Sequence, residues 1–232
     1  MSKGQRIITP RVILGVFFFI VLVPFLPLLI SRQWDWWEAW VYAIISILTF
    51  AISRMLAAHR HPDIVAERAR FLQHENTQTW DQKLTPLLGL VGILVMVVCG
   101  LDELLGWSPI FSLALKMIAL VIILAGHVLG TYALMENRYF SGTVRLQANR
   151  DQQVVLSGPY QWIRHPGYAG ALLADMAIPI FLDSIWAYLP TSLLIALFIL
   201  RTALEDRFLQ DELAGYRDYT KRVRYRLIPG VW

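Results

Sequence analysis

The chain has 232 residues, of which 56% are hydrophobic and only 16% are charged. Soluble domains carry roughly 25% charged residues, so this composition leaves too little polar surface for a soluble globular protein. The formal net charge is +4, and the one cysteine, Cys99, lies in an apolar run. A disulfide framework, a CxxC redox pair and a zinc site of cysteine thiolates are therefore excluded. The numbers predict an integral membrane protein.

Six apolar blocks follow one another along the chain, at residues 12–30, 37–57, 84–105, 109–135, 168–182 and 185–204. The longer blocks can cross a hydrocarbon core of roughly 30 Å at about 1.5 Å per residue, whereas the fifth is marginal for a full crossing. We expect the first block to bend at Pro24 and Pro27. Only Asp183 and Ser184 join the last two blocks, which predicts a helical hairpin whose two ends emerge on the same side.

Positive charges predict the orientation in the membrane. Of the 21 lysines and arginines, all but Arg32 and Lys116 fall in segments that this arrangement puts on one side. The positive-inside rule makes that side cytoplasmic, with both termini on it, and this explains the basic charge without any nucleic acid. The predicted fold is an all-α membrane protein with about six transmembrane helices and a cytoplasmic C-terminal helix, divided into residues 1–135 and 136–232.

The segment that enters the fifth block is dense in hydrogen-bond donors and aromatic rings. Tyr160, Arg164, His165 and Tyr168 lie within nine residues of one another. Such a group is typical of an interfacial anchor, in which aromatic rings and snorkelling arginines sit at the membrane edge. It also carries the donors that a polar ligand needs, so a binding site is the second interpretation.

The far end of the predicted hairpin carries Arg201 and Glu205, which are four residues apart and share one helix face. One interpretation is a surface ion pair, which contributes about 0.3–0.5 kcal/mol. However, both ends of a hairpin emerge together, so this turn should lie near the segment from Tyr160 to Tyr168. Two polar groups that are distant in sequence would then meet, as a binding site requires.

These residues carry a family resemblance. The run G-P-Y-Q-W-I-R-H-P-G-Y-A-G, followed about forty residues later by R-x-x-x-E-D, resembles the isoprenylcysteine carboxyl methyltransferase (ICMT) family, and related membrane phospholipid methyltransferases share the R-H-P-x-Y-x-G signature. The likeness covers roughly residues 137–229. It implies an enzyme that binds S-adenosylmethionine without a Rossmann domain, and the chain indeed has no G-x-G among its fourteen glycines.

The resemblance also implies roles for individual residues. Arg201 would hold the substrate and, with Glu205 and Arg164, form the catalytic group. The cofactor would be lined by Gln147, Gln152, Gln153, Val154, Val155, Tyr160, His165, Pro166, Gly167, Tyr168 and Glu205. The chain departs from the family at Asp206, where relatives have a second glutamate.

The implied function is methyl transfer from S-adenosylmethionine to a carboxylate, thiol or amine of a lipid or lipidated acceptor. The active site would face the cytoplasm, in a bacterial-type inner membrane, with membrane lipids as the other partners. No metal is expected, because the pair His59 and His61 has no third ligand in sight. The alternative is a small carrier or assembly subunit without enzymatic activity. The roles of two polar residues in the spans stay open: His127 is interpreted either as hydrogen-bonded to a neighbour or as part of a substrate tunnel, and Asp175 either as functional or as structural.

Overall fold

The protein is described by a computed structural model over residues 14–15, 17–64 and 76–232, and none of these residues lies in a β-strand. The α-helices are α2 (Val23–Ser31), α3 (Trp37–Arg60), α5 (Asp81–Leu105), α6 (Leu113–Glu136), α7 (Pro166–Phe181), α8 (Tyr188–Glu212) and α9 (Tyr216–Arg222). A π-helical turn, η1 (Phe18–Leu22), precedes α2, and two short 3₁₀ turns, η3 (Ala148–Arg150) and η4 (Gly158–Gln161), lie between α6 and α7.

Four of these helices, α3, α5, α6 and α8, are long and apolar enough to cross a membrane by length and composition. They fit the integral membrane protein that the sequence predicts. The other two expected spans are shorter apolar helices, Phe18–Ser31 and Pro166–Phe181. Residues 12, 13 and 16 of the first predicted block lie outside the described part of the chain. The α7 helix has 16 residues and extends roughly 24 Å, which is less than the usual hydrocarbon thickness.

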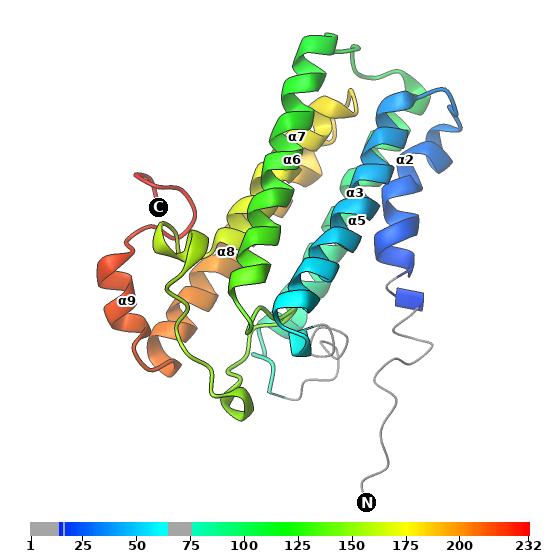
Figure 1. Cartoon of the computed structure of the whole chain (residues 1–232). Helices are drawn as coiled ribbons and strands as arrows, with labels where there is room; N and C mark the ends of the chain where they lie inside the picture. Colours follow the sequence, from blue (N-terminus) through cyan, green and yellow to red (C-terminus); the bar gives the residue numbers. More distant parts are fainter. Residues whose placement is uncertain (1–13, 16, 65–75) are drawn as a thin grey trace, which may run out of the picture.

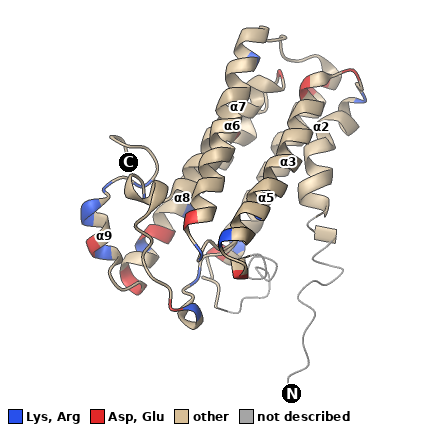
Figure 2. Ribbon diagram, in the orientation of Figure 1, with Lys and Arg blue, Asp and Glu red and all other residues tan. Residues whose placement is uncertain are grey.

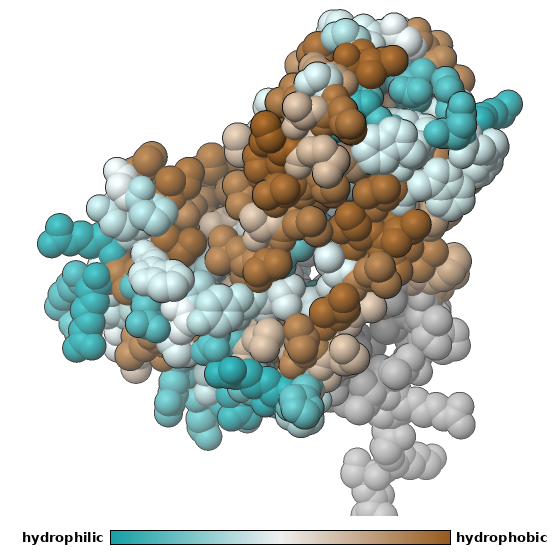
Figure 3. Space-filling model, turned by 45° about the horizontal axis from the view of Figure 1, so that its top comes forward, coloured by the Kyte–Doolittle hydropathy of each residue, from teal (hydrophilic) through white to brown (hydrophobic). Residues whose placement is uncertain are grey.

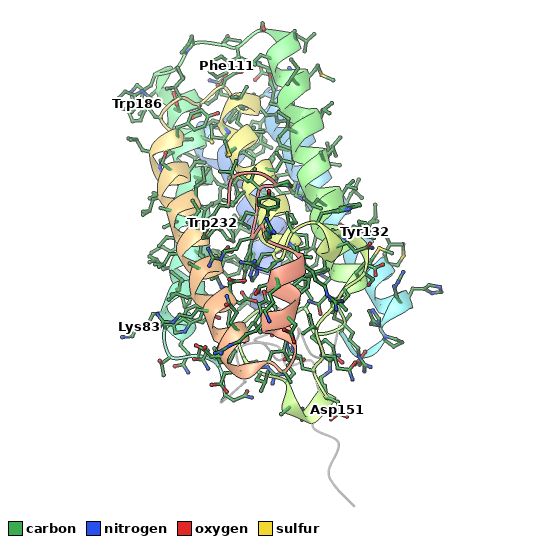
Figure 4. The ribbon with its side chains drawn as sticks, turned by 90° about the vertical axis from the view of Figure 1, so that its left-hand side faces the viewer. Lys83, Phe111, Tyr132, Asp151, Trp186 and Trp232 are labelled. Atoms are coloured by element: carbon green, nitrogen blue, oxygen red, sulfur yellow. The ribbon has the colours of Figure 1, made fainter. Side chains whose placement is uncertain are left out.

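The six larger helices run alongside one another and leave two distinct ends (Figure 1). Phe111 and Trp186 mark one end, here named the turn end, while Lys83 and Asp151 mark the opposite end, named the loop end (Figure 4). Charged side chains gather mainly at the loop end and on the C-terminal segment (Figure 2). Between them, one face of the molecule is largely hydrophobic, as the space-filling view shows (Figure 3).

Helices α6 and α7 pack in backbone contact because both carry glycine where they cross. A Cβ on Gly126 would lie 2.5 Å from the carbonyl oxygen of Gly170, and a Cβ on Gly170 would lie 2.6 Å from that of Gly126. Neither clash could be relieved by a side-chain rotation, so a larger residue at either position would separate the helices. This contact seats α7, and with it the start of the Arg164–Tyr168 segment, against the end of α6.

The predicted hairpin differs from the observed one in its joint and in its length. Residues 182–187 connect α7 to α8, rather than Asp183 and Ser184 alone. Asp183 has a φ of 50°, a left-handed conformation that ends the first helix. The second helix, α8, continues to Glu212 and stops before Gly215, whose φ is 80°. Arg201 and Glu205 therefore lie within a continuous helix, not near its end.

A buried ion cluster, here named the turn-end cluster, consists of Glu38, Lys116 and Asp183. The Lys116 ammonium pairs with both carboxylates, and all three residues are less than one-tenth exposed. Asp183 also accepts the backbone N–H of Phe111 at 2.7 Å. Because the three residues come from α3, α6 and the α7–α8 connection, the cluster ties those elements together at this end. Lys116, which the sequence analysis counts on the side opposite to the other positive charges, is a buried ion-pair partner in this cluster.

Candidate active site

A cavity of about 300 Å³ lies at the loop end, between the segment that follows α6 and the last turns of α8. The residues singled out in the sequence that line it are Gln147, Gln152, Gln153, Val154, Val155, Tyr160, Arg164, His165, Gly167, Tyr168, Arg201 and Glu205. Of that group only Pro166 is absent from the lining, because it forms the buried first residue of α7. Two segments that are distant in sequence thus border one cavity.

The loop that forms one wall is held by Asp81, the first residue of α5. The Asp81 carboxylate is fully buried and accepts the backbone N–H of Val144 at 2.7 Å. It also accepts two bonds from the Arg201 guanidinium, Nε to Oδ1 at 2.8 Å and Nη2 to Oδ2 at 3.1 Å. Nη2 of Arg201 donates to the carbonyl oxygen of Gly142 at 3.0 Å as well. A bidentate pair of this kind fixes the plane of the guanidinium at the cavity wall.

Arg201 and Glu205 are not partners of one another, so the interpretation as a surface ion pair is wrong. Glu205 instead accepts the phenol O–H of Tyr168 at 2.6 Å. The Tyr168 ring stacks on the His165 ring with 5.9 Å between centroids and 11° between planes. The Arg201 guanidinium lies 5.4 Å from the centre of the same ring. Tyr168 therefore links the arginine, the histidine and the glutamate at one side of the cavity.

Asp206, the departure from the family pattern, does not line the cavity but organises the C-terminal segment behind it. Its carboxylate is fully buried. It accepts Nε and Nη2 of Arg164 at 2.7 and 3.0 Å, Nε of Arg226 at 2.9 Å, the O–H of Tyr216 at 3.1 Å and Nε2 of Gln210 at 2.8 Å, and it lies 3.4 Å from Nε2 of His165. Nη1 of Arg164 donates to two backbone carbonyls of the C-terminal segment, at 2.9 Å each. The Arg164 guanidinium is thus fully engaged with protein groups.

Gln147 is 1% exposed and has its amide engaged within the loop. Its Nε2 donates to the carbonyl oxygen of Tyr139 at 2.6 Å, and its Oε1 accepts Nη1 of Arg150 at 2.6 Å. Its backbone N–H donates to Oε1 of Gln152 at 2.7 Å. The two glutamines therefore shape the loop wall through mutual contacts, and Gln153 beside them is exposed.

An apolar cluster closes the cavity toward the C-terminus. Leu213, Tyr216, Tyr219 and Val223 form its buried part, with Leu146, Val154 and Leu209 packed against them. The O–H of Tyr219 donates to the carbonyl oxygen of Tyr160 at 2.6 Å, which fastens α9 to the turn before Arg164. Burial raises the pKa of Tyr160, Tyr216 and Tyr219 above the ordinary value, so all three stay neutral phenols at physiological pH.

Several residues of the site were missed in the sequence. Asp81, Asn137, Phe140 and Arg226 contact the cavity wall or its supports, and none belongs to the R-H-P or R-x-x-x-E-D motif. One sequence feature pointed to Asp81: it is an acidic residue just before an apolar block, a position typical of the start of a helix. Its partner could not be read from sequence, because 120 residues separate Asp81 from Arg201. Within the described ranges no group of three or more His, Cys, Asp or Glu residues could hold a metal ion.

Comparison with known proteins agrees with the resemblance seen in the motifs. Residues 117–211 match the isoprenylcysteine carboxyl methyltransferase (ICMT) family. That range contains all but the first turn of α6, the loop wall, α7 and nearly all of α8. A delta(14)-sterol reductase of Mus musculus is 34% identical over 84 residues, which are 35% of this chain and 20% of that protein. The chain thus spans about a fifth of the length of the curated relative it matches.

Proposed function

From the ICMT-like family assignment that residues 117–211 support, we propose that the protein is an S-adenosylmethionine-dependent methyltransferase of the membrane. It transfers a methyl group to a carboxylate of a lipid or lipidated acceptor, a thiol or amine being the other nucleophiles that the site allows. The observation that carries the proposal is the loop-end cavity, which gathers the motif residues of the loop and of α8 around one space.

The cavity offers a partner for each part of the cofactor. The Glu205 carboxylate suits the ammonium group, while His165 and the backbone N–H groups of residues 152–155 suit the carboxylate. The rings of Tyr160 and Tyr168 suit the adenine or the sulfonium, and the apolar side chains of Val154, Leu209 and Leu213 line the same space. When bound, S-adenosylmethionine supplies a methyl group that is already activated by the positive sulfur.

Arg201 is the residue we assign to the acceptor. Its Nε and Nη2 donate hydrogen bonds to the Asp81 carboxylate, and Nη2 also donates to the Gly142 carbonyl oxygen, whereas Nη1 makes no hydrogen bond to the described residues. A carboxylate acceptor could be received there, with the guanidinium held rigid from behind. An anionic nucleophile needs no general base, so the protein's task is to hold it in line with the methyl group and exclude water. Asp81 acts through Arg201 and is therefore a positioning residue.

We assign different roles to Arg164 and Glu205, although the family resemblance implies one catalytic group that contains both. Tyr168 donates to Glu205 at 2.6 Å and keeps the carboxylate directed along the cavity wall. Arg164 has its guanidinium directed to Asp206 and to backbone carbonyls, which supports a positioning role for it. Gln147 has a similar role in the loop, because its amide already has partners on both sides.

We also propose that the loop end faces the cytoplasm, with both termini there, in a bacterial-type inner membrane. The concentration of charged side chains at that end supports this orientation (Figure 2). On this view residues 136–232 form the catalytic region, and residues 1–135 supply the membrane bundle that carries Asp81. The sterol reductase similarity suggests a second candidate, a reductase. A reductase needs a hydride donor, and NADPH, a common biological one, is the probe for it.

Calorimetry with purified full-length protein in detergent tests the function. We expect saturable binding of S-adenosylmethionine and none of NADPH. Glu205→Gln should weaken the cofactor affinity about tenfold or more, because charged hydrogen bonds contribute about 1.5–3 kcal/mol. Asp211→Asn is the matched control, since Asp211 is an exposed acid further along α8. No binding at millimolar cofactor, or binding of NADPH alone, would contradict the proposal, and a carrier or assembly subunit would then be the remaining interpretation.

The acceptor assignment is tested separately with Arg201→Lys. Lysine keeps the charge but loses the planar fork, so cofactor affinity should stay while kcat/KM for the acceptor falls at least tenfold. Mass spectrometry of lipid extracts with isotope-labelled cofactor identifies the acceptor to be used. If the cofactor dissociation constant and the acceptor kcat/KM change together, Arg201 belongs to the cofactor site instead.

A further inference from the structure

A second cavity of about 350 Å³ lies within the helix bundle, between α3, α6 and α7. Phe140, Gly167 and Ala171 line both this cavity and the loop-end cavity, so the two are neighbours. The Phe140 ring packs directly on Gly167, where an added Cβ would approach it to 2.6 Å. The second cavity otherwise belongs to the membrane-crossing helices rather than to the loops.

The polar lining of this second cavity is unusual for membrane-crossing helices. Tyr42, Ser46, Thr49, Ser53, Arg54, His127, Thr131 and Asp175 all contribute to it. Thr49 and Ser53 satisfy their hydroxyls on the backbone of their own helix. In contrast, Nε2 of His127 and Nη1 of Arg54 are buried without a hydrogen-bond partner among the described residues. The expectation that His127 bonds to a neighbouring residue is therefore wrong.

Asp175 adds a carboxylate to the same cavity. It makes no hydrogen bond or ion pair to the described residues, and it lines the cavity together with Tyr42 of α3. An unpaired carboxyl group in a membrane-crossing segment is costly, and unmatched donors beside it add to the cost. Apolar residues could fill this position if packing were its only purpose, because α6 and α7 are already held together by Gly126 and Gly170. The unmatched groups indicate a partner that the protein itself does not provide.

The chemistry of the unmatched groups selects the partner. A carboxylate ligand would be opposed by Asp175, and an ammonium would give Arg54 and His127 nothing to bond. A hydroxyl group both donates and accepts, so it can serve the acid and the unmatched nitrogen groups together. Leu134, Ile178 and Phe50 complete the lining with apolar surface for a hydrocarbon body.

We propose that this second cavity binds the hydroxyl group of a lipophilic alcohol, with Asp175 as the acceptor and His127 and Arg54 as the other polar partners. The ligand would reach the site from the bilayer, through the helices that enclose it. Its binding does not depend on what the loop-end cavity holds, although Phe140, Gly167 and Ala171 border both spaces.

Photolabelling of the full-length protein in detergent tests this site. The probe is a sixteen-carbon alkanol with a diazirine in its chain, and its methyl ether is the matched probe that cannot donate a hydrogen bond. We expect saturable labelling of peptides from α3, α6 and α7, competed by unlabelled hexadecanol, and at least about fivefold weaker labelling by the ether, as loss of one hydrogen bond implies. This comparison uses the unaltered protein and so does not depend on the folding of any variant.

Two variants sharpen the test. Asp175→Asn and His127→Phe should each reduce labelling by the alkanol about fivefold or more, whereas Tyr188→Phe, in a helix outside the cavity, should leave it unchanged. Thermal melting of each variant confirms that it is folded. Equal labelling by the alkanol and its ether, or labelling confined to other helices, would overturn the proposal. Binding of S-adenosylmethionine, measured in parallel, reports on the loop-end cavity independently.

Discussion

Buried charges occur at both ends of the bundle, and those at the loop end border a cavity. The turn-end cluster of Glu38, Lys116 and Asp183 is enclosed, and none of its members lines either cavity described above. At the loop end, Asp81 pairs with Arg201 and Asp206 pairs with Arg164, and both arginines line a cavity. A buried ion pair by itself indicates structure; a buried ion pair that borders a cavity indicates a site.

The two ends also differ in what their ion pairs do for the fold. Desolvation offsets much of the attraction in a buried pair, so such pairs add little net stability, while removal of one partner leaves an uncompensated charge. At the turn end the cluster therefore holds α3, α6 and the α7–α8 connection together, because separating them would leave a buried charge without its partner. At the loop end the same physics holds donors in one orientation beside the cavity, which is what a binding site requires.

The largest expected effect comes from Asp206→Asn. The change leaves Arg164 and Arg226 buried or half-buried without their shared carboxylate, which should lower the free energy of unfolding by about 3–5 kcal/mol. Because Arg164 also supports the cavity wall, affinity for S-adenosylmethionine should fall as well. Thermal melting in detergent and calorimetry measure the two effects, with Asp211→Asn as the exposed control. Wild-type stability in Asp206→Asn would show that the C-terminal segment is held by its apolar cluster alone.

The next largest effect is predicted for Lys116→Met at the turn end. It leaves Glu38 and Asp183 buried without their cation, so we expect a loss of about 3 kcal/mol in stability. Cofactor affinity of the folded fraction should remain unchanged, since the cluster lies at the opposite end from the cavity. The exposed lysine at the loop end, Lys83→Met, serves as the control for both measurements. A parallel loss of cofactor affinity would mean that the two ends are coupled.

The smallest effect is expected for Asp63→Asn, at the surface of the loop end. Asp63 forms ion pairs with Arg150 and, at 3.2 Å, with Arg138. The hydrogen bond from Arg150, the larger cause, and that from Arg138 hold the pKa of the Asp63 carboxyl below its usual value. Because the Asp63 side chain is 45% exposed, loss of its ion pairs should change stability by less than about 1 kcal/mol. A carboxyl group whose pKa is lower in the folded than in the unfolded protein stabilises the fold at pH values above its unfolded-state pKa. That stabilisation is lost as the pH falls through the folded-state pKa.

Melting temperatures of wild type and Asp63→Asn, measured from neutral pH down into the acid range, check this sign. The difference between the two proteins should narrow as the pH falls. Asp35→Asn, an exposed acid at the turn end, is the matched control. A difference that widens toward low pH would show that Asp63 is not stabilised by its arginines.

Much of the loop-end cavity could be predicted from sequence, because its residues lie in two compact motifs. Tyr160, His165 and Tyr168 are within nine residues, and Arg201 and Glu205 are one helical turn apart, so local geometry already gathers each set. The joint between α7 and α8 was predicted too short, because an apolar run does not reveal that Asp183 turns left-handed to join an ion cluster. The pairing of Arg201 with Asp81 was also beyond the motifs, since it connects residues 120 positions apart.

The sequence by itself determined the helical membrane architecture and the family resemblance, because hydrophobic length and local motif spacing depend on neighbouring residues. Which partner each charge takes was decided only by the tertiary structure. Arg201 could have paired with Glu205 on its own helix, yet it pairs with Asp81, and Glu205 receives Tyr168 instead. The reason is that α5 and α7 present a carboxylate and a phenol to α8 at closer and better directed positions than the i,i+4 spacing offers.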